Sequence, residues 1–223
     1  MKNQLITRMK SSDKLLKFAA AIYSLPIFFC VIGKRHNNIQ YTGAFLRKTR
    51  IQINGKNNVV KIATENRLNN CLFYIRGNNC EIQIEKHCIL NDLELWIEDD
   101  GGKIIVGCRT TIQGGHIAAT EGESITIGED CMFSNKIEIR NGDSHAIFSK
   151  DSNQRINANK PVKIGTHVWL GTDVKVLKKV TIGDGAIIST GAIVTGSVEP
   201  NTIYAGVPAK KVKDNIYWER ERH

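Results

Sequence analysis

A period of six residues constrains this chain more than any other feature of its sequence. Between residues 162 and 198, two series of aliphatic residues each recur every six positions, and one runs two positions ahead of the other. The series are Ile164, Leu170, Val176, Ile182, Ile188 and Val194, and Val162, Val168, Val174, Val180, Ala186, Ala192 and Val198. An α-helix does not repeat every six residues, whereas a short strand places residues i and i+2 on one face. The pattern therefore predicts short strands joined by corners and stacked into a β-solenoid, with three hexads in each coil.

A longer period extends the same solenoid upstream. Aliphatic residues recur there at spacings of 22 and then 21 positions, and Asn and Gly cluster between them. The series include Ile53, Ile75 and Ile97, and also Leu68, Leu90 and Ile112. Spacings longer than three hexads indicate an additional corner loop in each coil. We therefore expect one all-β domain over residues 51–200, an extension over residues 1–50, and a cap over residues 201–223 that covers the last coil.

One long insertion interrupts the coils. Residues 140–161 lie between two predicted strands, and the segment is polar and rich in turn-forming residues. Long loops within a regular scaffold commonly carry function. The loop contains His145, and histidine exchanges its proton near neutral pH, which suits a general base. Asp143 and Arg140 are close in sequence, and either of them could orient the imidazole ring or a substrate.

The other histidines and the cysteines are predicted to be structural. His116 continues the inward phase of Ile104 and Thr110, which favours a hydrogen-bonded interior histidine. No short spacing of His and Cys residues matches a zinc site, so we expect no metal. Four cysteines fall beside or among apolar residues of the predicted strands; they are Cys80, Cys88, Cys108 and Cys131. We expect them to be buried reduced thiols, which indicates a reducing compartment.

The whole excess of positive charge lies in the N-terminal extension. The net charge is +9, and residues 1–50 contain ten Lys or Arg residues against one acid. Residues 51–223 contain 21 basic and 21 acidic residues, which argues against nucleic acid as a partner. The uncharged residues 18–33 include Pro26 and are fewer than the roughly 20 of a spanning helix. Two interpretations remain open, a helix docked on its own domain and a membrane-surface contact through residues 1–35, with a secretion signal third.

These motifs carry a resemblance to a known family. The hexads from VKIGTH to AIVTGS resemble those of the hexapeptide-repeat acyltransferases. EIRNGDSHAIFS, RIN and VKIGTHVWLG are similar to a branch that O-acetylates bacterial surface polysaccharides, such as polysialic acid capsules. The resemblance implies a left-handed parallel β-helix, acetyl-CoA as co-substrate, and a homotrimer that binds acetyl-CoA between adjacent subunits. It also implies a glycan acceptor, which is often anionic in this branch.

The resemblance also implies roles for individual residues. His145 lies 24 residues before Trp169, which is the family's spacing of catalytic His and Trp. His145 would take the proton from an acceptor hydroxyl for direct attack on the thioester, and Trp169 would line the site beside it. The positions that match the family's acetyl-CoA-binding segments are Trp169, Gly171, Thr172, Thr190, Thr195, Lys210 and Lys213. The residues expected to meet the acceptor are Arg140, Asn141, Asp143 and Arg155.

The leading hypothesis is an acetyl-CoA-dependent O-acetyltransferase that modifies hydroxyls of a capsule or lipopolysaccharide. The alternative is an N-acetyltransferase of an amino sugar or other small amine, since the same fold and groove serve both reactions. A solenoid that acts only as a binding surface is the third hypothesis, and it predicts neither CoA binding nor an effect of changing His145. We expect the enzyme in the cytoplasm, with the extension placing it at the inner face of the bacterial inner membrane.

Overall fold

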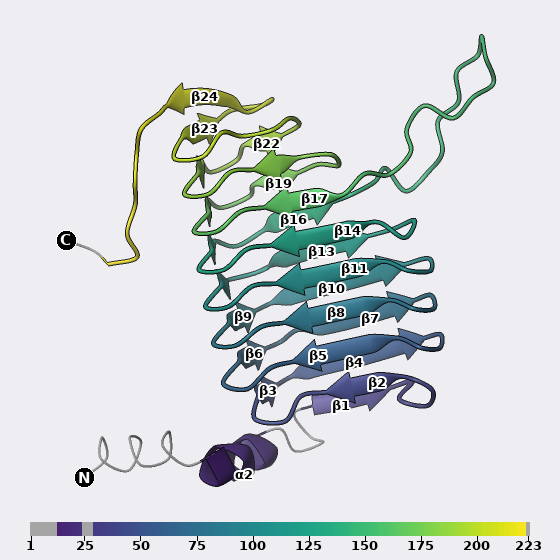
Figure 1. Ribbon diagram of the computed structural model, residues 1–223, viewed down its shortest axis with the longest axis vertical. Coiled ribbons are helices and arrows are strands. Elements are labelled where there is room, and N and C mark those ends of the chain that lie inside the picture. Colours follow the sequence, from purple (N-terminus) through teal and green to yellow (C-terminus); the bar gives the residue numbers. More distant parts are fainter. Residues whose placement is uncertain (1–12, 24–28, 222–223) are drawn as a thin grey trace.

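Each coil of the solenoid contributes one strand to each of three parallel sheets, which form the sides of a triangular prism (Figure 1). The computed structural model describes residues 13–23 and 29–221. We name the sheets A, B and C in the order in which the chain visits them. Neighbouring strands within a sheet come from successive coils, so side chains stack in register along the axis of the solenoid.

The strands of each sheet follow the order of the coils. Sheet A consists of β1 (Phe29–Ile32), β4 (Thr49–Asn54), β7 (Leu72–Arg76), β10 (Leu93–Glu98), β13 (Gly115–Ala119), β16 (Ile137–Arg140), β19 (Lys175–Val176) and β22 (Ile193–Val194). Sheet B consists of β2 (Asn38–Gln40), β5 (Val59–Ile62), β8 (Glu81–Ile84), β11 (Lys103–Val106), β14 (Ser124–Ile127), β17 (Val162–Ile164) and β20 (Thr181–Ile182). Sheet C consists of β3 (Phe45–Arg47), β6 (Arg67–Asn69), β9 (Ile89–Asn91), β12 (Thr111–Ile112), β15 (Met132–Phe133), β18 (Trp169–Leu170), β21 (Ile187–Ile188), β23 (Ile203–Ala205) and β24 (Lys210–Lys213). The last of these, β24, pairs antiparallel with β23 at the C-terminal end.

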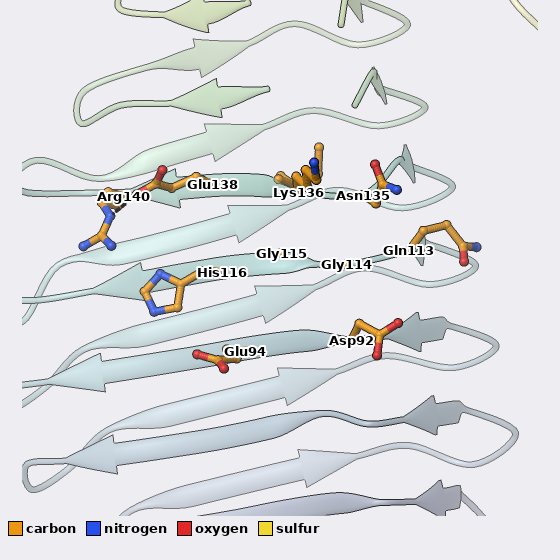
Figure 2. Close-up of a pocket in the computed structure, with 11 residues that line it drawn as sticks. Asp92, Glu94, Gln113, Gly114, Gly115, His116, Asn135, Lys136, Glu138 and Arg140 are labelled. Atoms are coloured by element: carbon orange, nitrogen blue, oxygen red, sulfur yellow. Dashed lines mark hydrogen bonds and ion pairs between the residues drawn. The ribbon is translucent and has the colours of Figure 1, made fainter. Parts of the chain in front are cut away.

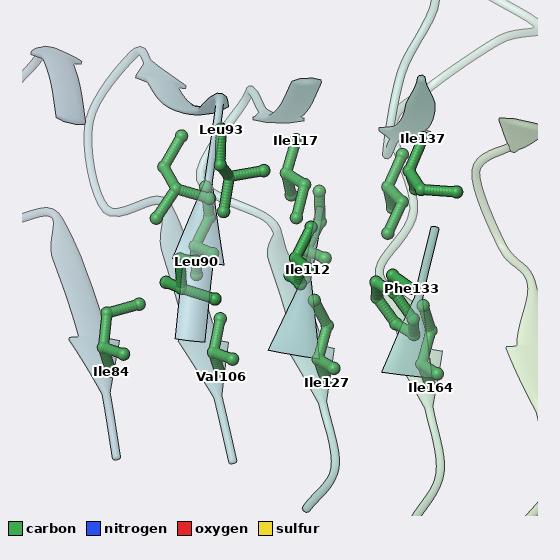
Figure 3. Close-up of a cluster of buried hydrophobic side chains, with 14 of the residues drawn as sticks. Ile84, Leu90, Leu93, Val106, Ile112, Ile117, Ile127, Phe133, Ile137 and Ile164 are labelled. Carbon is green, nitrogen blue, oxygen red and sulfur yellow. The ribbon is translucent and has the colours of Figure 1, made fainter. Parts of the chain in front are cut away.

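Aliphatic side chains from all three sheets fill the interior (Figure 3). One column in sheet B consists of Ile84, Val106, Ile127 and Ile164, which pair in register on successive coils. All the hexad positions predicted to face inward between residues 162 and 198 are buried, so that prediction is confirmed. Full burial of an aliphatic side chain contributes about 1.5–3 kcal/mol, and these columns are therefore the main source of stability.

Polar side chains close the corners from the inside. At the corner between sheets B and C, Asn66 is buried, and its Nδ2 donates to the Ala63 carbonyl at 2.9 Å. Its Oδ1 accepts from the Cys88 backbone N–H on the next coil at 2.7 Å. Thr110 Oγ1 makes the equivalent pair of bonds, donating to the Gly128 carbonyl and accepting from the Cys131 N–H, both at 3.1 Å. Each coil is thereby tied to the next without leaving a polar group of these two side chains unpaired.

The buried cysteines also lie at corners, Cys88 and Cys131 between sheets B and C, Cys71 between C and A, and Cys80 between A and B. Cys71, Cys80, Cys88 and Cys131 are free and buried, as predicted for the last three. Burial raises the pKa of Cys71 and Cys88 to about 12 and that of Cys131 to about 11. Cys108 differs from the prediction because it lies in the turn after β11, where its side chain is only half-buried.

The solenoid starts earlier than residue 51, where the sequence pattern placed its beginning. β1, β2 and β3 pair with β4, β5 and β6, so residues 29–47 form the first coil rather than part of an extension. The signal was present at Leu46, which is fully buried and in register with Leu68. The rest of this coil does not keep the spacing of 22, since Val31 pairs with Ile51 and Ile39 with Val60, which are 20 and 21 positions apart.

Helix α2 (Asp13–Tyr23) lies at the N-terminal end of the solenoid (Figure 1). Ala20 is buried, and the ring of Tyr23 contacts that of Phe45 edge-on with the centroids 5.8 Å apart. This segment is a helix docked on its own domain, which was one of the two interpretations left open. Residues 1–12 and 24–28, which hold much of the predicted membrane-contact segment, lie outside the described residues. Among the residues that the structure describes, no helix is long and apolar enough to cross a bilayer.

Candidate active site

The insertion after β16 forms an arm, residues 141–161, that projects from the corner between sheets A and B (Figure 1). Its two sides pair through backbone bonds, with the Ser149 N–H donating to Gln154 and the Ile156 N–H donating to Ile147, both at 2.9 Å. His145 lies on the outgoing side, and its side chain is exposed. The arm therefore carries the predicted general base away from the body of its own solenoid.

Asn157 organises the part of the arm that carries His145, a role that the sequence analysis did not assign. Its side chain is buried, and Nδ2 donates to the His145 carbonyl at 2.8 Å and to the Asp143 carboxylate at 2.9 Å. Its Oδ1 accepts from the backbone N–H of Ile147 at 2.7 Å. One amide thus braces the backbone on both sides of His145, from which the exposed imidazole projects.

Asp143 is bound to the body of the solenoid beside the base of the arm. Lys178, in the corner after β19, donates to the Asp143 carboxylate and to the Asn157 carbonyl, the latter at 3.2 Å. Hydrogen bonds from Lys178 and then from Asn157 hold the pKa of Asp143 below its ordinary value. Among the described residues, no hydrogen bond joins Asp143 to the imidazole ring of His145, so its predicted role toward the ring or the acceptor stays a prediction.

A cavity of about 490 Å³ lies beside the base of the arm. Its lining includes Arg155, Lys160, Lys178 and Lys179, and the structure pairs Arg155 with Glu121 at 2.6 Å. Thr195 also lines this cavity, so it lies apart from the other residues predicted to bind acetyl-CoA. The excess of basic side chains favours an anionic group in the cavity.

Most of the predicted acetyl-CoA-binding residues lie on sheet C, the side of the prism opposite the corner that bears the arm, or at the corner between sheets C and A. Trp169 in β18 is 38% exposed. Register places it in line with Ile187 in β21, Ile203 in β23 and Lys213 in β24. Since adjacent strands are about 4.8 Å apart, Trp169 and Lys213 mark a line of about 14 Å along the axis. Lys210 is exposed on the same terminal strand.

Small and hydroxyl-bearing residues flank this line at the corner between sheets C and A. A Cβ atom at Gly171 would lie 2.6 Å from the backbone nitrogen of Thr190, so the two coils stack there only because residue 171 is glycine. Thr172 Oγ1 lies 3.1 Å from Ser134 Oγ, and Thr190 is exposed. The structure thus gathers Gly171, Thr172 and Thr190 beside Trp169, on a surface where an extended ligand can approach the backbone closely.

Two residues predicted to meet the acceptor lie elsewhere. Asn141 is fully buried, and its amide bonds with the backbone of Thr120, accepting from the N–H at 2.9 Å and donating to the carbonyl at 3.0 Å. Arg140 pairs with Glu138 at 2.5 Å on the outer face of sheet A. Asn141 therefore anchors the arm to the preceding coil, and neither side chain lies beside His145 in a described contact.

The outer face of sheet A carries a second hollow, of about 710 Å³, lined by Glu94, His116, Glu138 and Arg140 among others (Figure 2). The prediction that His116 is a hydrogen-bonded interior residue is wrong. Its ring packs edge-on against Trp96 with the centroids 5.5 Å apart, and its buried Nδ1 has no hydrogen-bond partner in the described part of the chain. Burial, followed by the charge of Arg140, lowers the pKa of His116.

The turn before β13 explains the error. Gly114 and Gly115 pull the chain so close to the next coil that a Cβ at Gly115 would lie 2.2 Å from the Ile137 carbonyl oxygen. At this corner, between sheets C and A, the inward residues Ile112 and Ile117 are five positions apart rather than six, as Leu90 and Leu95 are one coil earlier, so Ile117 rather than His116 is buried and in register with Leu95. A shift of one residue moves a side chain to the opposite face of a strand.

Sequence reasoning also missed an aromatic residue beside Trp169. The ring of Trp218, from the C-terminal segment, lies 5.8 Å from that of Trp169. No periodic pattern marks Trp218, so only the folded chain reveals this pair. The described residues contain no group of three side chains that could hold a metal ion.

Comparison with known proteins agrees with this geometry. Residues 161–196 match the family model described as bacterial transferase hexapeptide (six repeats). The chain is 36% identical over 191 residues to the polysialic acid O-acetyltransferase of Neisseria meningitidis, an alignment that covers 76% of this chain and 89% of that protein. It is 38% identical over 120 residues to the polysialic acid O-acetyltransferase of Escherichia coli O1:K1, which covers 54% of this chain and 39% of that protein.

Two crystal structures share the architecture. The polysialic acid O-acetyltransferase OatWY superposes with a TM-score of 0.84 at 33% identity, covering 87% of this chain and 92% of that one. The polysialic-acid-specific acetyltransferase NeuO superposes with a TM-score of 0.76 at 31% identity, covering 86% and 85%. The expected left-handed parallel β-helix of the hexapeptide-repeat class is therefore confirmed. The chain belongs to the hexapeptide-repeat acetyltransferases, among the relatives of the bacterial polysialic acid O-acetyltransferases.

Proposed function

We propose that the protein transfers acetyl groups from acetyl-CoA to hydroxyls of a bacterial surface polysaccharide, at sites formed between copies of the chain. The names of its relatives support the reaction and the acceptor class. One observation supports the shared site: the arm with His145 leaves the corner between sheets A and B, whereas Trp169 lies on sheet C. On one chain the body of the prism separates the arm from sheet C (Figure 1). A cyclic trimer in which each arm reaches the sheet C of a neighbour brings the two together.

His145 acts as the general base in this proposal. Its imidazole accepts the proton of the acceptor hydroxyl while the hydroxyl oxygen forms a bond to the carbonyl carbon of the thioester. As the carbon–sulfur bond breaks, the imidazolium gives this proton to the departing sulfur, so the products are an acetyl ester and a free thiol. A cysteine nucleophile is disfavoured, because burial raises the pKa values of Cys71, Cys88 and Cys131 to between about 11 and 12.

The line from Trp169 to Lys213 fits the acyl donor. Acetyl-CoA supplies the acyl group, and Trp169 would lie beside its thioester. Gly171 and Thr172 leave the backbone accessible to the narrow pantetheine arm. Lys210 and Lys213, exposed on β24, would meet the phosphates through charge-assisted hydrogen bonds.

The basic cavity beside the arm supports an anionic sugar as the acceptor. Lys160 and Lys179 line it and are exposed, whereas Lys178 and Arg155 are paired with acids. A carboxylate on the glycan could replace these acids as the partner of Lys178 and Arg155. The alternative acceptor is an amino group on a small molecule, for which a basic cavity is a poor environment because it repels an ammonium ion.

Release of the CoA thiol from acetyl-CoA tests this function. The purified full chain is supplied with acidic and neutral bacterial polysaccharides, amino sugars and small amines. We expect thiol release with an acidic polysaccharide, and a loss of about 10²- to 10⁴-fold in His145→Ala. His87→Ala, at an exposed corner of a distant coil, is the matched control and should retain full activity. Thiol release only with amines would establish the alternative function. Failure to release thiol with any of the acceptors would overturn the proposed function.

We propose further that α2 contacts an anionic membrane surface. Leu15, Phe18 and Ile22 are exposed at spacings that place them on one face of the helix, opposite buried Ala20. Lys14 borders this face, and residues 1–50, to which the helix belongs, carry the net charge of the whole chain. An exposed apolar face with a lysine at its edge, within a basic segment, is the pattern of a helix that lies in the plane of an anionic bilayer.

Co-flotation with vesicles tests this contact. The full chain is expected to float with vesicles that contain anionic lipid and to remain behind with purely zwitterionic vesicles. Phe18→Glu should reduce the bound fraction while leaving the thermal midpoint unchanged, since Phe18 is 64% exposed. Absence of the wild-type chain from anionic vesicles would refute membrane contact without affecting the acetyl-transfer proposal.

A further inference from the structure

The C-terminal segment does not end on the cap. After β24, residues 214–221, which we call the strap, turn back and run along the corner between sheets B and C (Figure 1, yellow). The Ile216 N–H donates to Asn201 at 3.0 Å, Trp218 contacts His167, and Arg220 contacts Asp130. Asn201, His167 and Asp130 all lie at this corner on different coils, and each has a positive φ of 55–56°. The strap therefore crosses several coils and runs along the axis back toward the N-terminal end of the solenoid.

Trp218 is the main anchor of the strap. Its ring stacks on the imidazole of His167, with centroids 3.9 Å apart and planes inclined by 10°. Its Nε1 donates to the His167 carbonyl at 2.9 Å, and its own carbonyl lies 2.9 Å from His167 Nε2. Trp218 is 7% exposed, whereas the adjacent Tyr217 is 84% exposed. Two residues that are 51 positions apart thus bind each other through both their rings and their backbones.

Charged groups hold this anchor in place. His167 Nδ1 lies 2.7 Å from the Asp130 carboxylate, so both ring nitrogens face oxygen atoms. Arg220 donates to the same carboxylate at 2.8 Å and to the Cys131 carbonyl at 2.7 Å. Burial opposes ionisation of Asp130, but the bonds from His167 and Arg220 outweigh it and lower its pKa. The strap is therefore fixed by bonds on either side of Trp218.

The anchored ring lies directly beside Trp169. The centroids of the two indoles are 5.8 Å apart and their planes are inclined by 49°. Trp169 begins a strand of two residues and is partly exposed, so its own strand gives its ring little lateral support. Trp218 supplies that support on the side of the corner between sheets B and C.

We propose that Trp218 is a positioning residue for acetyl transfer, and that the strap forms the wall against which the indole of Trp169 is held. The inference rests on the proposed function, since it takes Trp169 as a residue that lines the thioester. A wall on one side restricts the rotation of Trp169, and a ring that must lie against the reacting group loses effectiveness when it is displaced by even about 1 Å. The strap thereby extends the site to residues that no periodic motif contains.

The kinetic test compares Trp218→Ala with Trp218→Phe. Phenylalanine can keep the stack on His167, whereas alanine removes the wall. We expect Trp218→Ala to lower kcat about tenfold and Trp218→Phe to stay within about threefold of wild type, with the KM for acetyl-CoA nearly unchanged in both. Trp96→Ala is the matched control and should leave kcat unchanged, because Trp96 contacts Tyr74 on sheet A, with ring centroids 4.5 Å apart and planes inclined by 45°. A normal kcat in Trp218→Ala, or equal losses in both Trp218 variants, would overturn the proposal.

Fluorescence gives a readout that needs no turnover. The chain has three tryptophans, so Trp169 is the sole one in Trp96→Phe/Trp218→Phe and in Trp96→Phe/Trp218→Ala. Acrylamide should quench Trp169 more strongly in the second protein, because the loss of the Trp218 ring exposes the indole. Should Trp218→Ala fail to fold, Arg220→Gln loosens the strap from the surface and should lower kcat in the same direction. If wild type turned over no acceptor, the proposed function would fail, while equal quenching in the two proteins would refute the wall itself.

Discussion

Mixing two inactive variants tests whether each site takes His145 from one copy and Trp169 from another. His145→Ala removes the proposed base from the arm and leaves sheet C intact, whereas Trp169→Ala does the opposite. Both side chains are exposed, so neither change should prevent folding. Each variant alone is expected to lose most of its activity, since every site in a pure oligomer lacks the same group.

The expected recovery follows from the placement of the two residues on opposite sides of the prism. In a ring assembled from equal amounts of both variants, an arm carries His145 in about half of the cases. The neighbouring sheet C carries Trp169 in about half of the cases as well, so about one quarter of the sites are complete. The fraction depends only on the mixing ratio and is the same for a trimer as for any other closed ring.

The assay is glycan-dependent thiol release by oligomers refolded from mixtures of the two variants. Activity should rise from near zero for either pure variant to about one quarter of wild type at equal amounts, and then fall symmetrically. Mixing the two proteins after assembly, without subunit exchange, is the control and should restore nothing. Activity that stays at the sum of the two residual activities in refolded mixtures would refute a site shared between copies.

Three further predictions concern the arm, the core and the thiols. Asp143→Asn should cost about 0.5–1 kcal/mol at neutral pH, because the bond to Lys178 is partly exposed. Since folding lowers the pKa of Asp143 from 3.8, the deficit should be full above pH 4 and vanish as acid protonates the wild-type carboxylate, which thermal melts across pH would record. Phe133→Ala should cost about 3–5 kcal/mol in urea unfolding, because this fully buried ring leaves a cavity between coils. In the native protein, a maleimide should label exposed Cys30 within minutes and leave Cys88 unlabelled, as read by peptide mass spectrometry, and early labelling of Cys88 would contradict its burial.

The sequence predicted the regular half of the solenoid well because each hexad repeats the same physical requirement. Every coil after β17 must place two aliphatic residues inward on each side, and a period of six leaves no other solution. Upstream coils contain extra residues whose position within the coil the spacing does not give. That uncertainty explains both His116, placed outward by a corner that is one residue shorter than in a hexad coil, and the first coil, whose aliphatic residues recur at 20, 21 and 22 positions.

In the site, too, the residues within sequence motifs were predicted, and those outside them were not. The motif around His145 and Trp169 was visible in the sequence, and the structure places the two residues on different sides of the prism. The residues that hold His145 and Trp169 in place could not be recognised in the sequence. Asn157 acts through bonds across the arm, and Trp218 reaches Trp169 only because a non-repeating segment returns to the solenoid. Contacts of this kind depend on tertiary folding, and no repeat in the sequence marks the residues that make them.

The strap also changes how the molecule can come apart. In a stack of repeats, each coil normally interacts only with its neighbours, so the ends unravel one coil at a time. Here the strap joins the final coil to those of His167 and Asp130, so the last coil cannot peel away until Trp218 and Arg220 have released the middle of the stack. The C-terminal coils are therefore coupled into one cooperative unit, and unravelling should begin at the opposite end, where α2 docks on the first coil.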